Sequence, residues 1–182
     1  MLKKALWGFI PAGILGLLLH KIVKEKLLGN DLIVVWALLL GGVTLIALEF
    51  FVKNRKQSRD TISYGDACII GAVQALAFIP GVSRAAATIG AGLLLGISRK
   101  RTVEFSFFLA IPTMLAATGL ELMTTPSLLI SGNIMALGVG FLTSCIVAIV
   151  AIKLFLRFVQ NHSFVPFGIY RILIALLFLR FL

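Results

Sequence analysis

Apolar residues occupy most of this chain in long runs, and polar residues gather in the short stretches between the runs. Five of the runs approach about 20 residues, the length of α-helix that crosses a hydrocarbon core about 30 Å thick. The first of them is marginal in length. The pattern therefore predicts a bundle of membrane-spanning helices, over residues 5–19, 32–52, 105–120, 134–152 and 164–182.

Two further apolar stretches, residues 64–79 and 85–97, are too short to cross a membrane comfortably. As helices they would measure only about 20–24 Å. The residues between them include Pro80, which removes a backbone donor, and Gly81, which permits a sharp turn. We therefore expect the helix to break at this point.

Basic residues flank the two short stretches on both sides, at 53–59 and 99–101. If the stretches crossed the membrane as one kinked helix, these clusters would lie on opposite faces, whereas basic loops concentrate on the cytoplasmic face. The pattern favours a re-entrant hairpin over about residues 64–97, which enters and leaves on one side. Residues 121–133 carry no Lys or Arg and are expected outside. Residues 20–31 carry three lysines on that same predicted side, so the absolute orientation stays open.

Composition agrees with a membrane location for the whole chain. Of its 182 residues, 60% are hydrophobic and 13% are charged, and the mean hydropathy of +1.08 excludes an ordinary water-soluble domain. The formal charge of +10 would suggest nucleic acid as a partner in a soluble protein, but here membrane topology explains the basic clusters. We predict an all-α integral membrane protein, a polytopic helical bundle forming a single transmembrane domain over residues 1–182, in contact with membrane lipids and not with nucleic acid.

Several other side chains give weak signals of chemistry. Cys68 and Cys145 lie within apolar runs and lack the spacing of metal ligands, so we expect structural residues that are not disulfide-bonded. The two histidines lie at segment edges and are expected at the membrane interface. Glu49 precedes Lys53 by one helical turn, which favours an interfacial ion pair between them.

Arg84 is the most informative polar residue in the sequence. A guanidinium at a helix break inside the membrane is costly unless it faces a polar cavity or an anion. The second half-helix begins just after Arg84, so its free backbone N–H groups and positive dipole end point into the same space. Ser83 and Thr88 add hydroxyl groups, and an arginine can hold a phosphate through two parallel hydrogen bonds.

These residues predict a phosphate site at the tip of the hairpin. Gln74 is a candidate for the same cavity, with a simple interhelical hydrogen bond as the alternative. The alternative for Arg84 is an arginine that reaches the membrane interface, beside a Ser83 that only caps the helix.

The sequence around Arg84 resembles a known family. Residues 74–84 read QALAFIPGVSR, and together with Thr88 and residues 92–99 they are similar to the second signature of undecaprenyl-pyrophosphate phosphatases, the bacitracin-resistance family. The resemblance continues through residues 104–112 to residues 170–172. Nearly the whole chain is similar to the C-terminal two thirds of that family.

The resemblance implies two inverted repeats, each with a re-entrant helix pair, whose tips meet in a cavity open to the outside. It also implies hydrolysis of a polyprenyl diphosphate lipid to the monophosphate with a divalent cation, Mg²⁺ or Ca²⁺, in the bacterial inner membrane, to recycle the lipid carrier of cell-wall synthesis. By the same resemblance, Arg84 and Ser83 are catalytic, Arg84, Ser83 and Thr88 bind phosphate oxygens, and Gly81 lets the backbone approach the ligand.

Two departures from the family pattern bear on activity. The first signature, a Glu-rich stretch running into Pro-x-Ser-Ser-x-x-His, is not in this sequence, and Ala85 and Ala86 replace a Ser and a Gly of the second signature. The chain is therefore expected to be a gene fragment or a short relative. A transporter or flippase for a polyprenyl phosphate and a catalytically inactive binding subunit stay open as alternatives, as does a homodimer.

Overall fold

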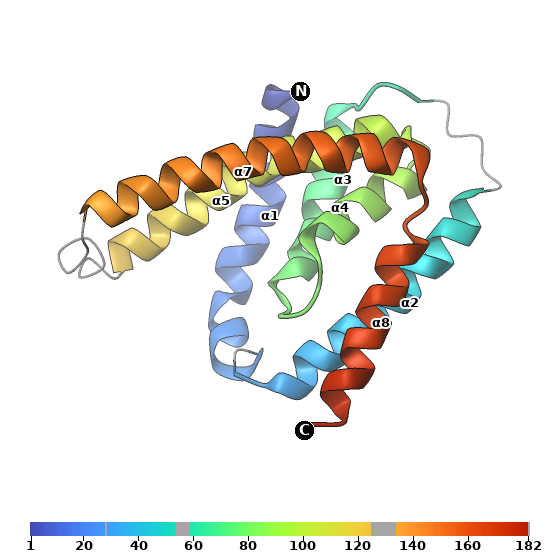
Figure 1. Ribbon diagram of the computed structural model, residues 1–182. Helices are drawn as coiled ribbons and strands as arrows, with labels where there is room; N and C mark the ends of the chain where they lie inside the picture. The colour runs from blue at the N-terminus through green and yellow to red at the C-terminus, as the bar shows by residue number, and fades with distance from the viewer. Residues whose placement is uncertain (28, 54–58, 125–133, 182) are drawn as a thin grey trace.

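The computed structural model describes residues 1–27, 29–53, 59–124 and 134–181. Over these ranges the chain is helical, apart from short turns and a single isolated bridge between Arg59 and Ile97. The elements in chain order (Figure 1) are α1 (Leu2–Ile22), the π-helical turn η1 (Val23–Leu27), α2 (Asp31–Lys53), α3 (Tyr64–Gln74), the 3-10 turn η2 (Ala75–Phe78), α4 (Arg84–Leu94), α5 (Arg99–Thr124), α7 (Ile134–Asn161) and α8 (Val165–Leu179).

Four of these helices are long and apolar enough to cross a membrane: α1, α2, α5 and α7. Their surfaces are largely apolar and exposed, which suits contact with lipid and confirms a polytopic helical membrane protein. The fifth predicted run forms α8, which is only 15 residues long and packs along α2. Most of the predicted external loop, residues 125–133, lies outside the described residues.

The expected helix break is present between α3 and α4. Ser63 and Asp66 form a capping box that starts α3, and η2 ends it at Phe78. Gly81 then takes a φ of +91°, which L side chains rarely adopt, and α4 begins at Arg84. In Figure 1 the two helices lie side by side with this turn at one end. We call α3, η2, the turn and α4 the hairpin.

Small residues let α1 approach the hairpin closely. A Cβ on Gly71 of α3 would overlap the backbone carbonyl of Gly8 on α1, so neither helix could hold this distance with a larger residue at position 71. Beside this crossing, Ala5, Ala67 and Ile70 are fully buried. The backbones of α1 and the hairpin are therefore in direct contact at Gly8 and Gly71.

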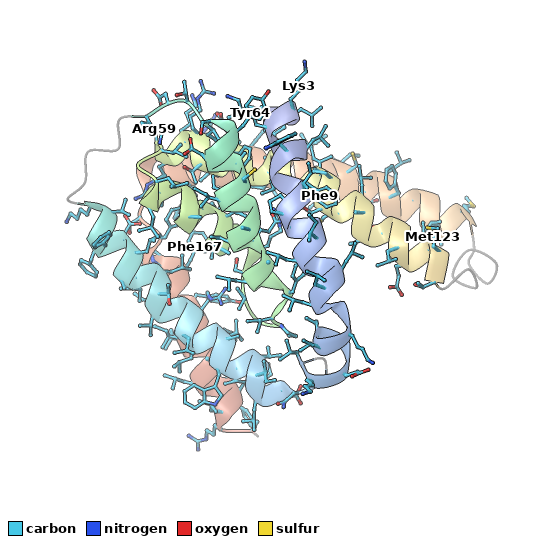
Figure 2. The ribbon with its side chains drawn as sticks, turned by 180° about the vertical axis from the view of Figure 1, so that it is seen from behind. Lys3, Phe9, Arg59, Tyr64, Met123 and Phe167 are labelled. Carbon is cyan, nitrogen blue, oxygen red and sulfur yellow. The ribbon has the colours of Figure 1, made fainter. Side chains whose placement is uncertain are left out.

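The open ends of the hairpin lie together. The backbone N–H of Arg59 donates to the carbonyl of Gly96 at 3.4 Å, and the N–H of Ser98 donates to the carbonyl of Arg59 at 2.9 Å. Figure 2 places Arg59 and Tyr64 at the same end of the molecule as Lys3. The hairpin therefore begins and finishes at one end of the bundle, next to basic residues.

The predicted ion pair between Glu49 and Lys53 is wrong. Glu49 is only 9% exposed and accepts a hydrogen bond of 2.7 Å from Arg99, and its second oxygen accepts from the backbone N–H of Phe164 at 3.1 Å. Lys53 is exposed. The reason is that Glu49 points into the contact between α2 and the start of α5, where a cation from another helix is nearer than the neighbour on its own helix.

Both cysteines are free, as predicted. Cys68 is half-buried on α3, and Cys145 is exposed on the apolar surface of α7.

Candidate functional site

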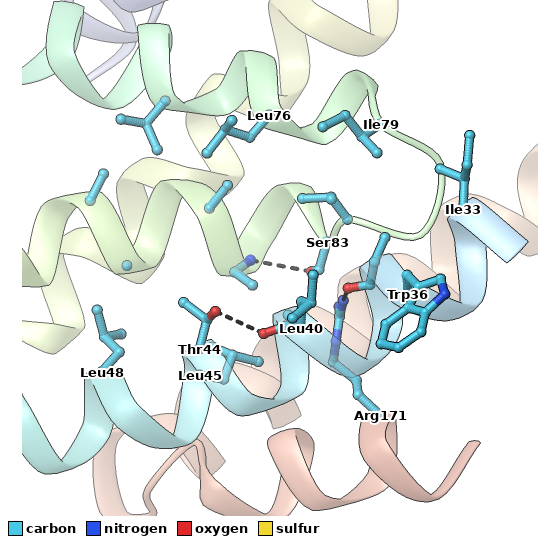
Figure 3. A pocket seen from close by; sticks show the side chains of 18 of the residues that line it. Ile33, Trp36, Leu40, Thr44, Leu45, Leu48, Leu76, Ile79, Ser83 and Arg171 are labelled. Carbon is cyan, nitrogen blue, oxygen red and sulfur yellow. Dashed lines mark hydrogen bonds between the residues drawn. The ribbon is translucent and has the colours of Figure 1, made fainter. Parts of the chain in front are cut away.

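An apolar cleft of about 820 Å³ lies between α2 and the hairpin, and we call it the α2–α4 cleft. Figure 3 shows α2 on one side and the hairpin on the other, with Arg171 of α8 reaching in. The residues of α4 and its N-cap on this wall recur every three to four positions, so they form one face of the helix. They are Ser83, Ala86, Ala87, Gly90, Ala91 and Leu94.

Ser83 lies at the end of this face, where α4 begins. Its Oγ accepts a hydrogen bond of 3.2 Å from the backbone N–H of Ala86, so Ser83 is the N-cap of α4. Its side chain also lines the cleft. Ser83 therefore caps α4, which was the alternative considered from the sequence. Ser83 also remains on the wall of the cleft.

The side chain of Arg84 extends toward α5 and not toward the α2–α4 cleft. Its Nη1 donates a hydrogen bond of 2.9 Å to the backbone carbonyl of Ser106 on α5, and the residue is half-buried. Within the part of the chain that the structure describes, Arg84 has no carboxylate partner. A carbonyl dipole orients this guanidinium but leaves its net positive charge in place.

Thr88 lies one turn further along α4, on the side of Arg84. Its hydroxyl bonds back to the carbonyls of Arg84 at 3.0 Å and Ala85 at 3.2 Å, and it lies 2.7 Å from the hydroxyl of Ser106. Thr88 is 1% exposed and Ser106 is 2% exposed. In this arrangement Thr88 joins α4 to α5, and its role toward phosphate stays a prediction.

Gln74, at the end of α3, is only 2% exposed. Its Nε2 donates to the hydroxyl of Thr113 at 3.0 Å, which in turn donates to the carbonyl of Leu109 at 2.7 Å. The Oε1 atom of Gln74 is buried without a hydrogen-bond partner. The interhelical bond considered from the sequence is present, and one unpaired acceptor remains, which is costly in an apolar interior.

Gly81 lies against α2 as well as at the tip of the hairpin. A Cβ at this position would come within 2.6 Å of the carbonyl oxygen of Val34, so the close approach that this glycine permits in the structure is toward α2. Its part in admitting a phosphate stays a prediction.

Arg171 of α8 is a residue to which the sequence assigned no role. Its Nη2 donates to the carbonyl of Gly81 at 2.9 Å and to the carbonyl of Ala37 at 3.2 Å. Its Nε is buried without a partner. The guanidinium therefore joins α8, α2 and the hairpin tip at the edge of the cleft.

Ser106, Thr113 and Arg171 share a sequence signal that would have found them. Each is a polar residue inside an apolar helix, and such residues in membrane segments usually face the protein interior. The sequence does not indicate which residue each of them contacts.

The residues described here do not form a complete metal site. No group of three or more His, Cys, Asp or Glu side chains in that part of the chain is placed to hold a metal ion. Among the residues that the structure describes, none is therefore assigned as a ligand of the divalent cation implied by resemblance.

Residues 1–177 match the family model described as bacitracin resistance protein BacA. The chain is 48% identical over 182 residues to the undecaprenyl-diphosphatase of Persephonella marina, covering 98% of this chain and 71% of that protein. It is 47% identical over 178 residues to that of Wolinella succinogenes, covering 96% and 69%. For the undecaprenyl-diphosphatase of Aquifex aeolicus the identity is 44% over 181 residues, covering 98% and 71%.

Proposed function

We propose that this chain, which belongs to the bacitracin resistance protein BacA family, hydrolyses undecaprenyl diphosphate to the monophosphate in the bacterial inner membrane. The family match covers nearly the whole chain, and relatives at 44–48% identity are named as diphosphatases. Their names favour hydrolysis over the transporter and the inactive binding subunit. The product would return to the lipid carrier pool of peptidoglycan synthesis.

One observation carries the proposal for the site: Arg84 holds a positive charge at the start of α4 without a carboxylate partner among the described residues. A guanidinium has five N–H donors, and the bond to Ser106 uses one nitrogen. The other donors can hold two oxygens of a phosphate group. A diphosphate also supplies the negative charge that the half-buried Arg84 lacks.

The start of α4 supports the same ligand. The N–H of Ala86 is satisfied by the hydroxyl of Ser83, but the N–H groups of Arg84 and Ala85 belong to the first turn and have no partner within the helix. These groups and the helix dipole attract an anion. Hydrolysis joins a water oxygen to the terminal phosphorus and breaks the bond between the two phosphates, so negative charge grows on the departing oxygen of the lipid monophosphate, and we assign to Arg84 the role of stabilising that charge.

A divalent cation, Mg²⁺ or Ca²⁺, belongs to the same proposal. Bound to the diphosphate, it would offset negative charge and polarise the phosphoryl oxygens. We also propose that two copies of the chain associate as a homodimer. Light scattering of the protein–detergent complex measures its mass and so tests for the dimer.

Phosphate release from undecaprenyl diphosphate in detergent micelles tests the proposal. We expect Arg84→Ala to lower the rate by about 10²- to 10³-fold, the usual cost of removing one donor to a developing charge. Arg84→Lys should recover only part of it, because an ammonium lacks the two-pronged geometry. The matched control is Arg101→Ala, which removes a half-exposed arginine paired with Glu104 at 3.1 Å.

Two results would contradict the proposal in different ways. If the parent chain releases no phosphate, the activity assigned to it is wrong. If the parent is active and Arg84→Ala matches it, the activity stands and the site is misplaced.

A further inference from the structure

Basic and aromatic side chains of α1 and α3 meet at the open end of the hairpin. The rings of Trp7 on α1 and Tyr64 on α3 pack edge to face, with their centroids 6.1 Å apart. The Nζ atom of Lys4 lies 5.8 Å from the centroid of the Tyr64 ring. Lys3 is the exposed neighbour of Lys4, and Figure 2 shows it at the same end of the molecule as Tyr64. We call Lys3, Lys4, Trp7 and Tyr64 the α1–α3 cluster.

Lys4 is held in place by groups that do not neutralise it. Its Nζ donates a hydrogen bond to the backbone carbonyl of Ile62, a buried residue next to the N-cap of α3. This carbonyl and the face of the Tyr64 ring orient the ammonium group while its positive charge remains. An ammonium group has three N–H donors, so two remain for a ligand beside the bond to Ile62.

The α1–α3 cluster carries two positive charges without a carboxylate partner. Over the ranges that the structure describes, neither Lys3 nor Lys4 belongs to an ion pair. Arg59, at the same end of the molecule, is by contrast paired with Asp66 at 2.7 Å. The exposed carboxylate of Asp60 pairs with neither lysine. The cluster therefore offers its two ammonium groups to an anion.

The surroundings of the cluster suit a lipid. Trp7 and Tyr64 are both about half exposed, and such rings, apolar with one polar tip, favour the boundary between membrane and water. Ile10 and Ile14 follow Trp7 by one and two turns on the same face of α1, and both are exposed. The cationic groups therefore lie at the end of an apolar strip along a membrane-spanning helix.

We propose that the α1–α3 cluster binds the phosphodiester headgroup of an anionic phospholipid, with one acyl chain along Ile10 and Ile14. Two uncancelled positive charges favour a headgroup with a net negative charge over a zwitterionic one, which brings its own cation. The bound lipid contacts both α1 and the start of α3. The site lies at the opposite end of the hairpin from Ser83 and Arg84, so the inference does not rest on the proposed function.

Native mass spectrometry of the whole chain, released from detergent micelles, tests the proposal with dioleoyl-phosphatidylglycerol as the probe. We expect one tightly bound probe molecule and weaker binding of dioleoyl-phosphatidylcholine. Lys4→Gln should lower the affinity for the probe about fivefold, the usual contribution of one lysine to the binding of anionic lipid. Lys4→Arg should retain it. The matched control is Lys53→Gln, which removes an exposed lysine at the end of α2 and should leave the affinity unchanged.

Tyr64→Leu distinguishes a built site from general attraction to basic residues. It removes the ring that orients Lys4 but changes no charge, so a loss of affinity of about two- to fivefold is expected. Tyr64→Phe keeps the ring and should keep most of the affinity. If Lys4→Gln does not fold, Lys3→Gln repeats the charge test at an exposed position.

Four results would overturn the proposal. Full affinity in Lys4→Gln removes the lysine from the site, and full affinity in Tyr64→Leu or an equal loss in Lys53→Gln leaves only general electrostatic attraction. Equal affinity for phosphatidylcholine contradicts selection by headgroup charge. Displacement of the probe by glycerol phosphate at similar concentrations means that the site takes a free phosphate ester and not a lipid.

Discussion

Arg171 on α8 donates a hydrogen bond of 2.9 Å to the carbonyl oxygen of Gly81, at the tip of the hairpin. The same nitrogen donates to Ala37 on α2 at 3.2 Å. One guanidinium thus connects the turn that precedes Arg84 to the two helices across from it. The position of the candidate phosphate site depends on a residue near the end of the chain.

Replacing Arg171 by methionine should therefore misplace the hairpin tip. A hydrogen bond from a charged group contributes about 1.5–3 kcal/mol, and loss of two such bonds also frees the turn at Gly81. We expect a lower thermal midpoint in detergent and a lower rate of phosphate release. Arg180→Met, at an exposed position of the same C-terminal region, should change neither. Wild-type stability and rate in Arg171→Met would show that the two bonds do not position the turn.

Gly71→Ala tests the crossing of α1 and α3. The added Cβ would overlap the carbonyl of Gly8, so the two backbones must separate, at a cost of about 1–3 kcal/mol. The expected result is a lower thermal midpoint for the detergent-solubilised protein. Gly138→Ala is the control, because a Cβ there meets nothing within 4 Å. Equal midpoints for the two variants would mean that α1 and α3 do not pack as described.

Glu49→Gln distinguishes the observed partner of Glu49 from the one expected by helical spacing. It weakens the pair with Arg99, whose guanidinium is mostly buried, and breaking a buried pair from one side costs about 3–5 kcal/mol. Lys53→Gln should have almost no effect, because Lys53 is exposed. Thermal unfolding of both variants measures the difference. A larger loss for Lys53→Gln would restore the pair predicted from the sequence.

The re-entrant hairpin predicts that Asp60 and Lys100 lie on the same face of the membrane. Both are exposed residues near the open end of the hairpin, where Arg59 and Ser98 share a backbone hydrogen bond. Single cysteines at the two positions should react with a membrane-impermeant maleimide from one side only, and from the same side. The background is a chain with Cys68 and Cys145 replaced by alanine. Labelling from opposite sides would replace the hairpin by a kinked spanning helix.

The sequence by itself determined most of the helices and the location of the break between α3 and α4. Long apolar runs form helices in a membrane because only internal backbone hydrogen bonds are available there. Pro80 lacks a backbone donor and Gly81 takes a φ of +91°, so the turn between α3 and α4 depends on local chemistry. The position of Arg84 at the start of a short helix can likewise be read from the local sequence. It indicated the candidate site without any knowledge of packing.

Only the tertiary structure decided which side chains meet. The spacing of residues along a helix states which of them share a face, but not which helix that face contacts. Ser83 and Arg84 are adjacent in sequence, yet one lines the α2–α4 cleft and the other bonds to Ser106 on α5. Glu49 binds Arg99 rather than Lys53 for the same reason. The bond from Arg171 to Gly81 joins positions 90 residues apart, and no local pattern encodes it, because it exists only once α8 has packed against α2.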